Sequence, residues 1–293
     1  MPARPGTVAL VTSERLSERG WNDTDTPLVR TALEQRGIHA QLVPWHEDVD
    51  WSSYALAVLR SPWDMFLGHL NEFFDWLEQA EKQTLVLNAP SVVRRVLDKH
   101  YLQDLAAAKV PVIPTAFVEL GQSPKFPDVE FVVKPVISGG ASNSARYRPD
   151  DVVAATTHVK YLHEQGVAAM VQLYMSSIDS EGERALMFFN DVYDHAIVKQ
   201  AILAPGESFE VVRKLHPGPR AYEPTKAEQS VARAALEVMS NEGELLSGRV
   251  DMVADSNNNP AIMELELIAP TLFLTHDDGA VERFADAICR RLP

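Results

Sequence analysis

The first ninety residues alternate between short apolar runs and amphipathic stretches. Apolar runs at residues 7–12, 38–43, 55–59 and 84–87 have the length and flanking turn residues of buried strands. Residues 25–36 have the pattern of a helix that ends at Gly37. A second helix is predicted from apolar residues at helical spacing: Phe66, Leu70, Phe73, Phe74 and Leu77. Strands that alternate with helices favour a small parallel sheet flanked by helices.

The pattern changes after residue 90. Helices are predicted at residues 91–97, 98–109, 150–165, 226–241 and 277–292. Strands are predicted at 131–136, 168–175, 184–189 and 192–203, and a hairpin is predicted from 248–254 and 261–267. A loop rich in glycine and serine occupies residues 137–144, and Asn190-Asp191 is a predicted turn. We therefore expect an α/β domain over residues 1–90 and a larger α+β portion with mostly antiparallel sheets over residues 91–293.

Composition fits a globular protein and excludes several other classes. Of 293 residues, 46% are hydrophobic and 23% are charged, so disorder, collagen and coiled coil are poor descriptions. The 27 basic and 41 acidic residues give a net charge of −14, which disfavours general nucleic-acid binding. No run of 18 apolar residues occurs, and the first apolar segment is too short for a secretory signal. We therefore expect a cytoplasmic protein that does not interact with membranes.

The single cysteine, Cys289, has no partner for an internal disulfide, and a reducing compartment is the simplest interpretation. It lies in the last predicted helix, and no motif containing histidine points to it. We expect this residue to fill core or surface space and not to act as a nucleophile.

The predicted hairpin near the C-terminus gathers acidic residues on one face. Side chains alternate along a strand, so Arg249 shares a face with Asp251, and Glu264 shares a face with Glu266. If residues 254 and 261 pair beside the turn, Asp251 faces Glu264, and Arg249 then faces Glu266. The opposite, apolar face holds Val250, Met252, Met263 and Leu265. Facing carboxylates repel each other, which favours a compensating Mg²⁺ ion; the alternative is a solvated face with an Arg–Glu ion pair.

Two lysines lie where an anionic partner would explain them. Lys134 ends a predicted strand and leads into a loop with Gly139 and Gly140, where backbone amides can approach a phosphate closely. Lys99 lies at a helix start, where its charge opposes the helix dipole. The alternatives are a solvated loop lysine and a helix-surface lysine. The loop is neither a P-loop nor a Gly-x-Gly-x-x-Gly fingerprint, so both common nucleotide-binding folds lose support.

Two further segments are candidates for ligand binding. The backbone of Gln172 and Leu173 could present an amide and a carbonyl to the edge of an adenine, although a core strand is the more ordinary explanation. Arg60, Trp63 and Asp64 follow the third predicted strand. There, Arg60 could bind the carboxylate of an amino acid and Asp64 its ammonium group. The alternative is a capped helix start with a packed tryptophan.

Taken in order along the chain, these motifs resemble the ATP-grasp superfamily. The resemblance covers about residues 88–293 and rests on Asp98-Lys99, Val133-Lys134-Pro135 with its Ser-Gly-Gly loop, residues 172–175, Glu183-Arg184, Lys199, Arg249-Val250-Asp251 and Glu264-Leu265-Glu266. Residues 60–64 are similar to the substrate-domain signature of a small bacterial branch. That branch groups with glutathione synthetase and ribosomal-protein glutamate ligase, and it includes cyclo-ligases that close D-cycloserine from O-ureido-D-serine.

The resemblance implies an ATP-grasp fold, with an N-terminal parallel α/β substrate domain and two antiparallel-sheet lobes, about residues 110–172 and 173–293, that grip ATP. It implies a carbon–nitrogen ligase that uses ATP and Mg²⁺ to phosphorylate a carboxyl or carbonyl group of a small amino-acid-like substrate. The enzyme then joins or cyclises that group with an amine and releases ADP and phosphate. Ring closure to D-cycloserine is the most specific expectation. The alternatives are an amino-acid or dipeptide ligase of natural-product biosynthesis and a non-catalytic ATP-binding module. Relatives are often homodimers.

The resemblance also implies roles for single residues. The implied ATP contacts are Lys99 and Lys134 at the phosphates, Gly139 and Gly140 in a mobile covering loop, Gln172 and Leu173 at adenine, and Glu183 at the ribose. The implied Mg²⁺ ligands are Asp251, Glu264 and Glu266. The residues implied to steady the transferring phosphoryl group or the tetrahedral intermediate are Lys199 and Arg249. The implied substrate contacts are Arg60, Trp63, Asp64 and Arg184. Many relatives have asparagine at the position of Glu266, which leaves the number of metal ions open.

Overall fold

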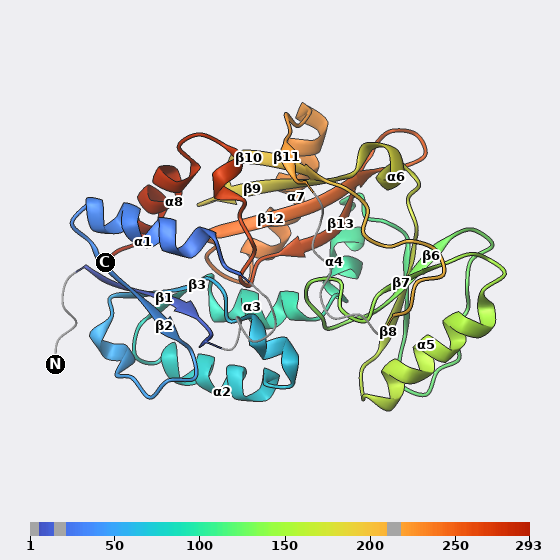
Figure 1. Ribbon diagram of the computed structural model, residues 1–293, viewed down its shortest axis with the longest axis horizontal. Helices are drawn as coiled ribbons and strands as arrows, with labels where there is room; N and C mark the ends of the chain where they lie inside the picture. The colour runs from blue at the N-terminus through green and yellow to red at the C-terminus, as the bar shows by residue number, and fades with distance from the viewer. Residues whose placement is uncertain (1–5, 15–21, 210–217) are drawn as a thin grey trace.

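The computed structural model describes residues 6–14, 22–209 and 218–293, which form three sheets (Figure 1). The first sheet is parallel, with strand order β2-β1-β3-β4, as the alternating pattern predicts. Its region contains β1 (Thr7–Thr12), α1 (Asp25–Gln35), β2 (His39–Pro44), η2 (Trp51–Ser53), β3 (Leu56–Leu59), η3 (Trp63–Leu67), α2 (Leu70–Ala80) and β4 (Leu85–Leu87). Alternate residues of β1 pack against α1 on one face and α2 on the other, so the strand is apolar throughout.

The second sheet is antiparallel, with strand order β5-β8-β6-β7. Its region contains α3 (Pro90–Leu97), α4 (Tyr101–Ala107), β5 (Thr115–Val118), β6 (Phe131–Pro135), β7 (Ala145–Tyr147), α5 (Val152–Glu164) and β8 (Ala169–Leu173). Buried residues of α5, among them Ala155, Val159 and Leu162, pack onto the sheet. The predicted glycine and serine loop connects β6 to β7.

The third sheet is also antiparallel, with strand order β11-β10-β9-β12-β13. Its region contains α6 (Ser177–Glu181), β9 (Glu183–Phe189), β10 (Val192–Lys199), β11 (Arg220–Ala221), α7 (Lys226–Ser240), β12 (Ser247–Ala254), β13 (Pro260–Glu266), η4 (Leu274–His276) and α8 (Ala280–Cys289). Asn190 and Asp191 both have positive φ and make the predicted turn between β9 and β10. A capping box of Thr225 and Glu228 begins α7.

The helix predicted around residues 66–77 is broken near its start. Phe66 belongs to the short helix η3, Gly68 follows with a φ of 96°, and α2 begins at Leu70. Glycine adopts this left-handed conformation without steric cost, so the chain can turn there. As a result, Phe66 leaves the apolar row of α2 and lines the cavity described below.

The β12–β13 hairpin differs from its predicted register by one residue. Ala254 pairs with Pro260 and not with Ala261. A bulge between the Met252–Ile262 pair and the Asp251–Glu264 pair then restores the predicted register at Asp251. The residue left without a partner in this ladder is Met263. Its predicted place on the apolar face is wrong, because the bulge turns it toward the cavity.

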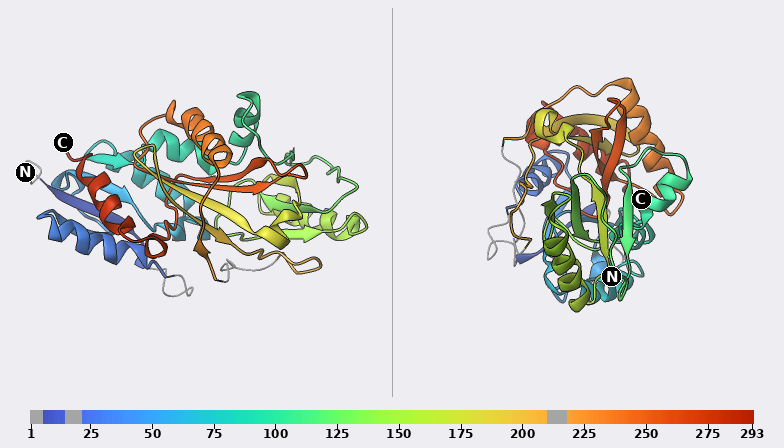
Figure 2. Two further views of the ribbon diagram at one scale, coloured as in Figure 1. Left: turned by 90° about the horizontal axis from the view of Figure 1, so that it is seen from above. Right: turned by 90° about the vertical axis from the view of Figure 1, so that its right-hand side faces the viewer.

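The third sheet lies between the other two, which occupy opposite ends of the molecule (Figures 1 and 2). Helices α1 and α8 pack together between the first and third sheets, in one apolar cluster that includes Val8, Leu33, Met187 and Phe284. Cys289 of α8 is partly buried against this cluster, as expected of a space-filling residue. None of the helices in the described ranges combines the length and hydropathy that a membrane crossing requires.

Candidate active site

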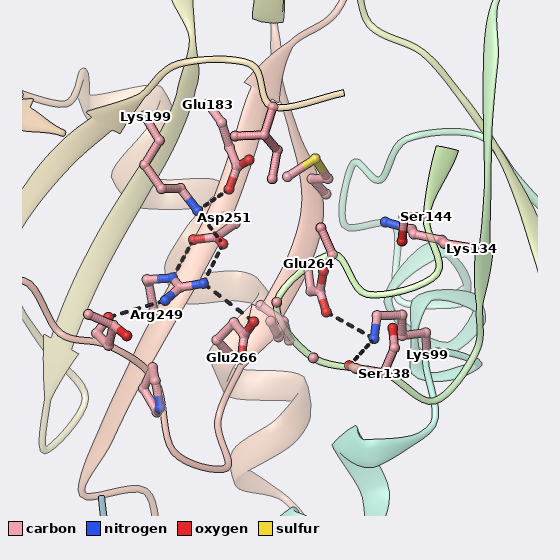
Figure 3. A pocket seen from close by; sticks show the side chains of 18 of the residues that line it. Lys99, Lys134, Ser138, Ser144, Glu183, Lys199, Arg249, Asp251, Glu264 and Glu266 are labelled. Carbon is pink, nitrogen blue, oxygen red and sulfur yellow. Dashed lines mark hydrogen bonds and ion pairs between the residues drawn. The ribbon is translucent and has the colours of Figure 1, made fainter. Parts of the chain in front are cut away.

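A cavity of about 320 Å³ lies where the three sheets meet. Its walls come from η3 of the first region, the β6–β7 loop and β8 of the second, and strands β9, β10, β12 and β13 of the third. The sequence-predicted residues that line it are Trp63, Lys99, Lys134, Gly139, Gly140, Gln172, Leu173, Glu183, Lys199, Arg249, Asp251, Glu264 and Glu266. Figure 3 shows the acidic residues of the third sheet, with Lys199 and Arg249 among them, on one side and Lys99 and Lys134 on the other.

Asp251 lies at the centre of a buried cluster of charges. Arg249 binds its carboxylate at two points, Nε to Oδ1 at 2.8 Å and Nη2 to Oδ2 at 2.9 Å. Lys199 Nζ lies 2.9 Å from Oδ2 of Asp251 and also pairs with Glu183. Lys199 and Glu183 are directly opposite each other on β10 and β9, so the sheet ladder itself fixes the cluster.

The members of this cluster carry their charges unequally. Burial would raise the pKa of Asp251, but Arg249 and Lys199 outweigh it and hold that pKa well below its usual range. Burial raises the pKa of Glu183 to about 7; Lys199 opposes this shift and Asp251 adds to it. Asp251 therefore keeps its negative charge between the two cations, whereas burial shifts Glu183 toward its neutral form.

Glu264 and Glu266 of β13 are the carboxylates that open toward the cavity. Their side chains are 23% and 30% exposed, compared with 4% for Asp251. Glu264 Oε1 lies 3.0 Å from Lys99 Nζ, and Glu266 Oε1 lies 3.3 Å from Arg249 Nη2. Burial raises the pKa of Glu266, although Arg249 partly offsets the shift. Each glutamate thus has one cationic partner and an open side.

These oxygen donors fit Mg²⁺, which in proteins takes one or two carboxylates together with substrate phosphates. Within residues 6–14, 22–209 and 218–293, no three metal-binding side chains form a ready-made cage. In this structure Asp251 is bound to Arg249 and Lys199, so its predicted role as a metal ligand would require one of these contacts to be exchanged. Glu264 and Glu266 fit a metal ion whose remaining ligands come from a bound phosphate.

Lys99 and Lys134 form the opposite wall of the cavity. Lys99 lies between α3 and α4, is 4% exposed, and donates from Nζ to the carbonyl of Ser138 at 2.9 Å. Lys134 on β6 is 9% exposed, and its burial lowers its pKa although nearby carboxylates partly offset the shift. Gly140 in the loop beside them has a φ of 63°, which glycine tolerates. Two buried cations beside a glycine loop suit a polyphosphate.

Leu173 leaves a backbone carbonyl for a ligand at the edge of the cavity. Its N–H donates to the carbonyl of Pro114 at 3.0 Å, but Pro114 has no N–H that could return the bond. On the other side, the N–H of Tyr174 donates to the carbonyl of Glu130 at 2.9 Å. Hydrogen-bonded and non-hydrogen-bonded pairs alternate along an antiparallel ladder, so the neighbouring pair of Leu173 with Phe131 has no backbone hydrogen bonds. In the described part of the chain, this carbonyl therefore has no donor. The backbone of Gln172 is paired within the sheet.

Arg184, a predicted substrate contact, is not part of the cavity lining in this structure. Adjacent residues of a strand point to opposite faces, so Arg184 lies on the other side of β9 from Glu183. Its Nε lies 3.2 Å from Glu228 of α7, and it also pairs with Glu181.

Arg60 and Asp64 are both buried and are not part of the cavity lining in this structure. Asp64 is fully buried and accepts a hydrogen bond from Trp45 Nε1 at 2.7 Å. Arg60 is 1% exposed, and its guanidinium lies 5.1 Å from the ring of Phe284 in α8. Trp63, the third residue of that motif, does line the cavity and donates from Nε1 to the carbonyl of Ala269 at 2.7 Å.

The segment after β13, which contributes none of the candidate site residues predicted from the sequence, closes the cavity beside Arg249. Asp25 of α1 accepts hydrogen bonds from the amides of Leu272 at 2.9 Å and Leu274 at 3.2 Å, and so holds this segment in place. Within it, the carbonyl of Thr271 accepts a hydrogen bond from Arg249 Nη1 at 3.1 Å. In the sequence, this segment could have been recognised as part of the site by its position directly after the acidic hairpin. Phe66 was also missed, since its spacing indicated only a helix.

Comparison with known proteins relates this arrangement to one family. Residues 8–88 match the model of the N-terminal domain of D-cycloserine synthetase DcsG. The cycloserine biosynthesis protein DcsG of Streptomyces lavendulae is 35% identical over 288 residues, which cover 92% of this chain and 94% of that protein. The crystal structure of D-cycloserine synthetase DcsG has a TM-score of 0.87 and 34% identity, over 98% of this chain and 100% of that chain.

A more distant solved structure shares the fold. ATP-grasp ligase PsnB, complexed with precursor peptide PsnA2 and AMPPNP, has a TM-score of 0.65 and 15% identity, over 100% of this chain and 99% of that chain. The expected ATP-grasp fold is therefore confirmed, with its parallel α/β region and two antiparallel sheets. Because it shares 35% sequence identity with DcsG over more than 90% of both proteins, the chain belongs to the D-cycloserine synthetase family of ATP-grasp ligases.

Proposed function

We propose that this protein is an ATP- and Mg²⁺-dependent carbon–nitrogen ligase that phosphorylates a small amino-acid-like substrate. The observation that most supports this is the facing pair of walls: Lys99 and Lys134 on one side, Glu264 and Glu266 on the other. Phosphoryl transfer depends mainly on positioning and on neutralising charge. Two buried cations opposite two open carboxylates meet both needs.

In this proposal, Lys99 and Lys134 bind the phosphates of ATP, and the loop of Gly139 and Gly140 covers them. The unpaired Leu173 carbonyl accepts a hydrogen bond from the amino group of adenine, and Gln172 shapes that edge. Glu183 lies at the ribose. These assignments follow the resemblance, and the unpaired carbonyl and the buried lysines support them independently.

Glu264 and Glu266 would hold Mg²⁺ together with the phosphates, and Asp251 would join them by exchanging one of its cationic partners. When bound, Mg²⁺ neutralises charge on the transferring phosphoryl group. Arg249 and Lys199, held by Asp251, stabilise the same group as it moves from ATP to the substrate carboxylate. That transfer gives ADP and an acyl phosphate. A nitrogen atom then attacks the acyl carbon, and phosphate leaves.

For the substrate, we propose ring closure of O-ureido-D-serine to D-cycloserine. The nitrogen bonded to oxygen attacks the acyl carbon and phosphate leaves, and water removes the carbamoyl group from that nitrogen as carbon dioxide and ammonia. The 35% identity to DcsG over nearly the full length of both chains supports this choice. The cavity is lined by Trp63, Met65 and Phe66 as well as by Arg249. Apolar side chains together with one guanidinium suit a small substrate with a carboxylate.

The proposal also keeps the expected organisation of the chain. It divides the protein into a substrate domain over residues 1–90 and an ATP-grasp region over 91–293, with lobes of about 110–172 and 173–293. It places the enzyme in the cytoplasm, where ATP is supplied, and assigns it a homodimer. Light scattering on the purified protein would test the dimer.

The proposed activity is tested by incubating the protein with ATP, Mg²⁺ and single amino acids or ureido compounds. We expect ADP and phosphate to form only with O-ureido-D-serine, together with a product that has the mass of D-cycloserine. A dipeptide product would instead identify an intermolecular ligase. Tight ATP binding without turnover on any substrate would indicate a non-catalytic module. Release of AMP and pyrophosphate would contradict the proposed chemistry.

A further inference from the structure

Phe66 of η3 packs directly on Gly139 of the glycine loop. A Cβ atom at Gly139 would lie 2.8 Å from Cε2 and 2.9 Å from Cδ2 of the Phe66 ring, which is closer than Cβ atoms approach in proteins. The aromatic ring therefore occupies the space that any larger residue would need. Both residues line the cavity, so this contact closes the seam between the first region and the second.

Both sides of this contact are anchored. On the side of η3, Trp63 donates to the carbonyl of Ala269 at 2.7 Å, and Met65 is 1% exposed. On the side of the loop, the carbonyl of Ser138 accepts a hydrogen bond from Lys99 at 2.9 Å, and Lys99 in turn lies 3.0 Å from Glu264. The Ser138-Gly139 segment is thus held between Lys99 on one side and the ring of Phe66 on the other.

We propose that Phe66 is a positioning residue that holds the glycine loop closed over ATP and so couples ATP consumption to ligation. The inference rests on the proposed function. An acyl phosphate reacts with water if the site opens, which returns the unchanged carboxylate and releases phosphate. Each such event consumes one ATP without product. By packing against Gly139, the ring of Phe66 holds the glycine loop closed and keeps water out during the lifetime of the acyl phosphate.

The first test compares ADP with ligated product in the Phe66→Ala variant. We expect several ADP molecules per product, where the unmodified protein gives equal amounts, and a smaller change in KM for ATP than in the yield of product. Phe66→Leu should recover most of the coupling, because it keeps an apolar side chain against Gly139. Phe74→Ala is the matched control, since Phe74 is another partly buried phenylalanine of the same region but does not line the cavity.

The second test uses the close contact between Phe66 and Gly139, which leaves no room for a side chain at Gly139. Gly139→Ala should displace the loop, raise KM for ATP and increase the ratio of ADP to product. Adding Phe66→Ala removes the ring that the new methyl group meets, so the double variant should couple better than Gly139→Ala alone. An additive loss in the double variant would overturn the inference.

A readout that needs no substrate separates this inference from the proposed function. With AMPPNP and Mg²⁺ bound, backbone amides of residues 137–144 should exchange hydrogen faster in Phe66→Ala than in Phe74→Ala or the unmodified protein. If no compound is ligated but exchange differs in this way, the proposed substrate is wrong and the role of Phe66 in holding the loop stands. Equal exchange rates, or unchanged coupling in Phe66→Ala, would show that Phe66 only fills space.

Discussion

Glu264 and Asp251 differ in how much of the fold depends on their charge. Asp251 is bound by Arg249 and Lys199. Removing its charge would leave two buried cations without their shared carboxylate and lower the free energy of unfolding by about 3–5 kcal/mol. Glu264 is 23% exposed and has a single close cation, Lys99 at 3.0 Å. Substitution at Glu264 therefore separates effects on chemistry from effects on folding better than substitution at Asp251.

Glu264→Gln is expected to lower the rate of substrate-dependent ADP formation by about 100-fold, because one charged group at the transferring phosphoryl is lost. The free energy of unfolding should change by only about 1 kcal/mol, since the amide can still accept a hydrogen bond from Lys99. Steady-state ADP assays at saturating Mg²⁺ and urea denaturation measure the two effects. Glu282→Gln, at an exposed position of α8, is the control. An unchanged rate in Glu264→Gln would remove this residue from the metal site.

Lys134→Ala should weaken ATP binding by about ten- to a hundredfold, the loss expected for about 1.5–3 kcal/mol of charge-assisted hydrogen bonding. Burial already lowers the pKa of Lys134, so an anionic ligand stabilises its charged form. Titration calorimetry with AMPPNP measures the dissociation constant. Lys160→Ala serves as control, because that side chain is 76% exposed on α5. Equal affinities in the two variants would place Lys134 outside the nucleotide site.

At single positions, the sequence identified the charged residues of the third sheet because strand alternation assigns them to one face. The same rule excludes Arg184, which directly follows Glu183 and must point away from it. Asp64 could not be excluded in this way. Its indole partner, Trp45, lies 19 residues earlier, and only the folded chain brings the two together. Contacts between elements were therefore the part that a single sequence could not supply.

At the scale of elements, the acidic hairpin shows how a correct result can follow from an incorrect step. The pairing of Asp251 with Glu264 was predicted from a turn closed by residues 254 and 261, whereas Ala254 pairs with Pro260. The bulge compensates for this shift and also turns Met263 into the cavity. Periodicity specifies which strands pair, but a bulge adds a residue without changing the apolar pattern enough to be seen.

Besides its apolar contacts, helix α5 is joined to its sheet by the buried side chain of His158. His158 is fully buried, its Nε2 donates to the carbonyl of Asn143 at 3.1 Å, and its Nδ1 accepts from the hydroxyl of Tyr147 at 3.0 Å. The ring also stacks on Phe209, with centroids 4.1 Å apart. Burial lowers the pKa of His158 from 6.5 to about 4, so the folded protein holds the neutral ring.

This shift predicts a loss of stability on acidification. The unfolded chain binds a proton at His158 near pH 6.5, whereas the folded chain binds one only near pH 4. The stabilisation is complete above pH 6.5 and disappears as the pH falls toward 4, by roughly 3 kcal/mol. Urea denaturation across this range should show a shallower pH dependence for His158→Gln. His39→Gln, at an exposed position of β2, should keep the original slope, and equal slopes in all three proteins would contradict the assignment.

At the scale of the whole molecule, the cavity exists only while the three sheets keep their places. Among the polar side chains of the first region that connect it to the third are Asp25 and Asn88. Asp25 holds the segment after β13, and Asn88, directly after β4, contacts β12 and the residue that follows β13. Their partners lie more than 150 residues away in sequence, at 247–249 residues for Asp25 and 158–179 for Asn88. No local pattern in the sequence could have indicated them.

Asn88 is the clearest test of this connection. Its Nδ2 donates to the carbonyls of Ser247 at 2.7 Å and Leu267 at 2.6 Å, and its Oδ1 accepts from the amides of Leu246 at 2.6 Å and Ser247 at 3.1 Å. Asn88→Ala leaves these buried backbone groups without a partner, so the free energy of unfolding should fall by at least about 3 kcal/mol. Asn241→Ala, at an exposed position with a single 3.5 Å hydrogen bond, is the control for urea denaturation. Because Asn88 bridges the start of β12 and the residue after Glu266, the folded Asn88→Ala protein should also form ADP more slowly. A variant as stable as the Asn241→Ala control would show that apolar packing alone, and not this amide, joins the parallel sheet to the carboxylates of the cavity.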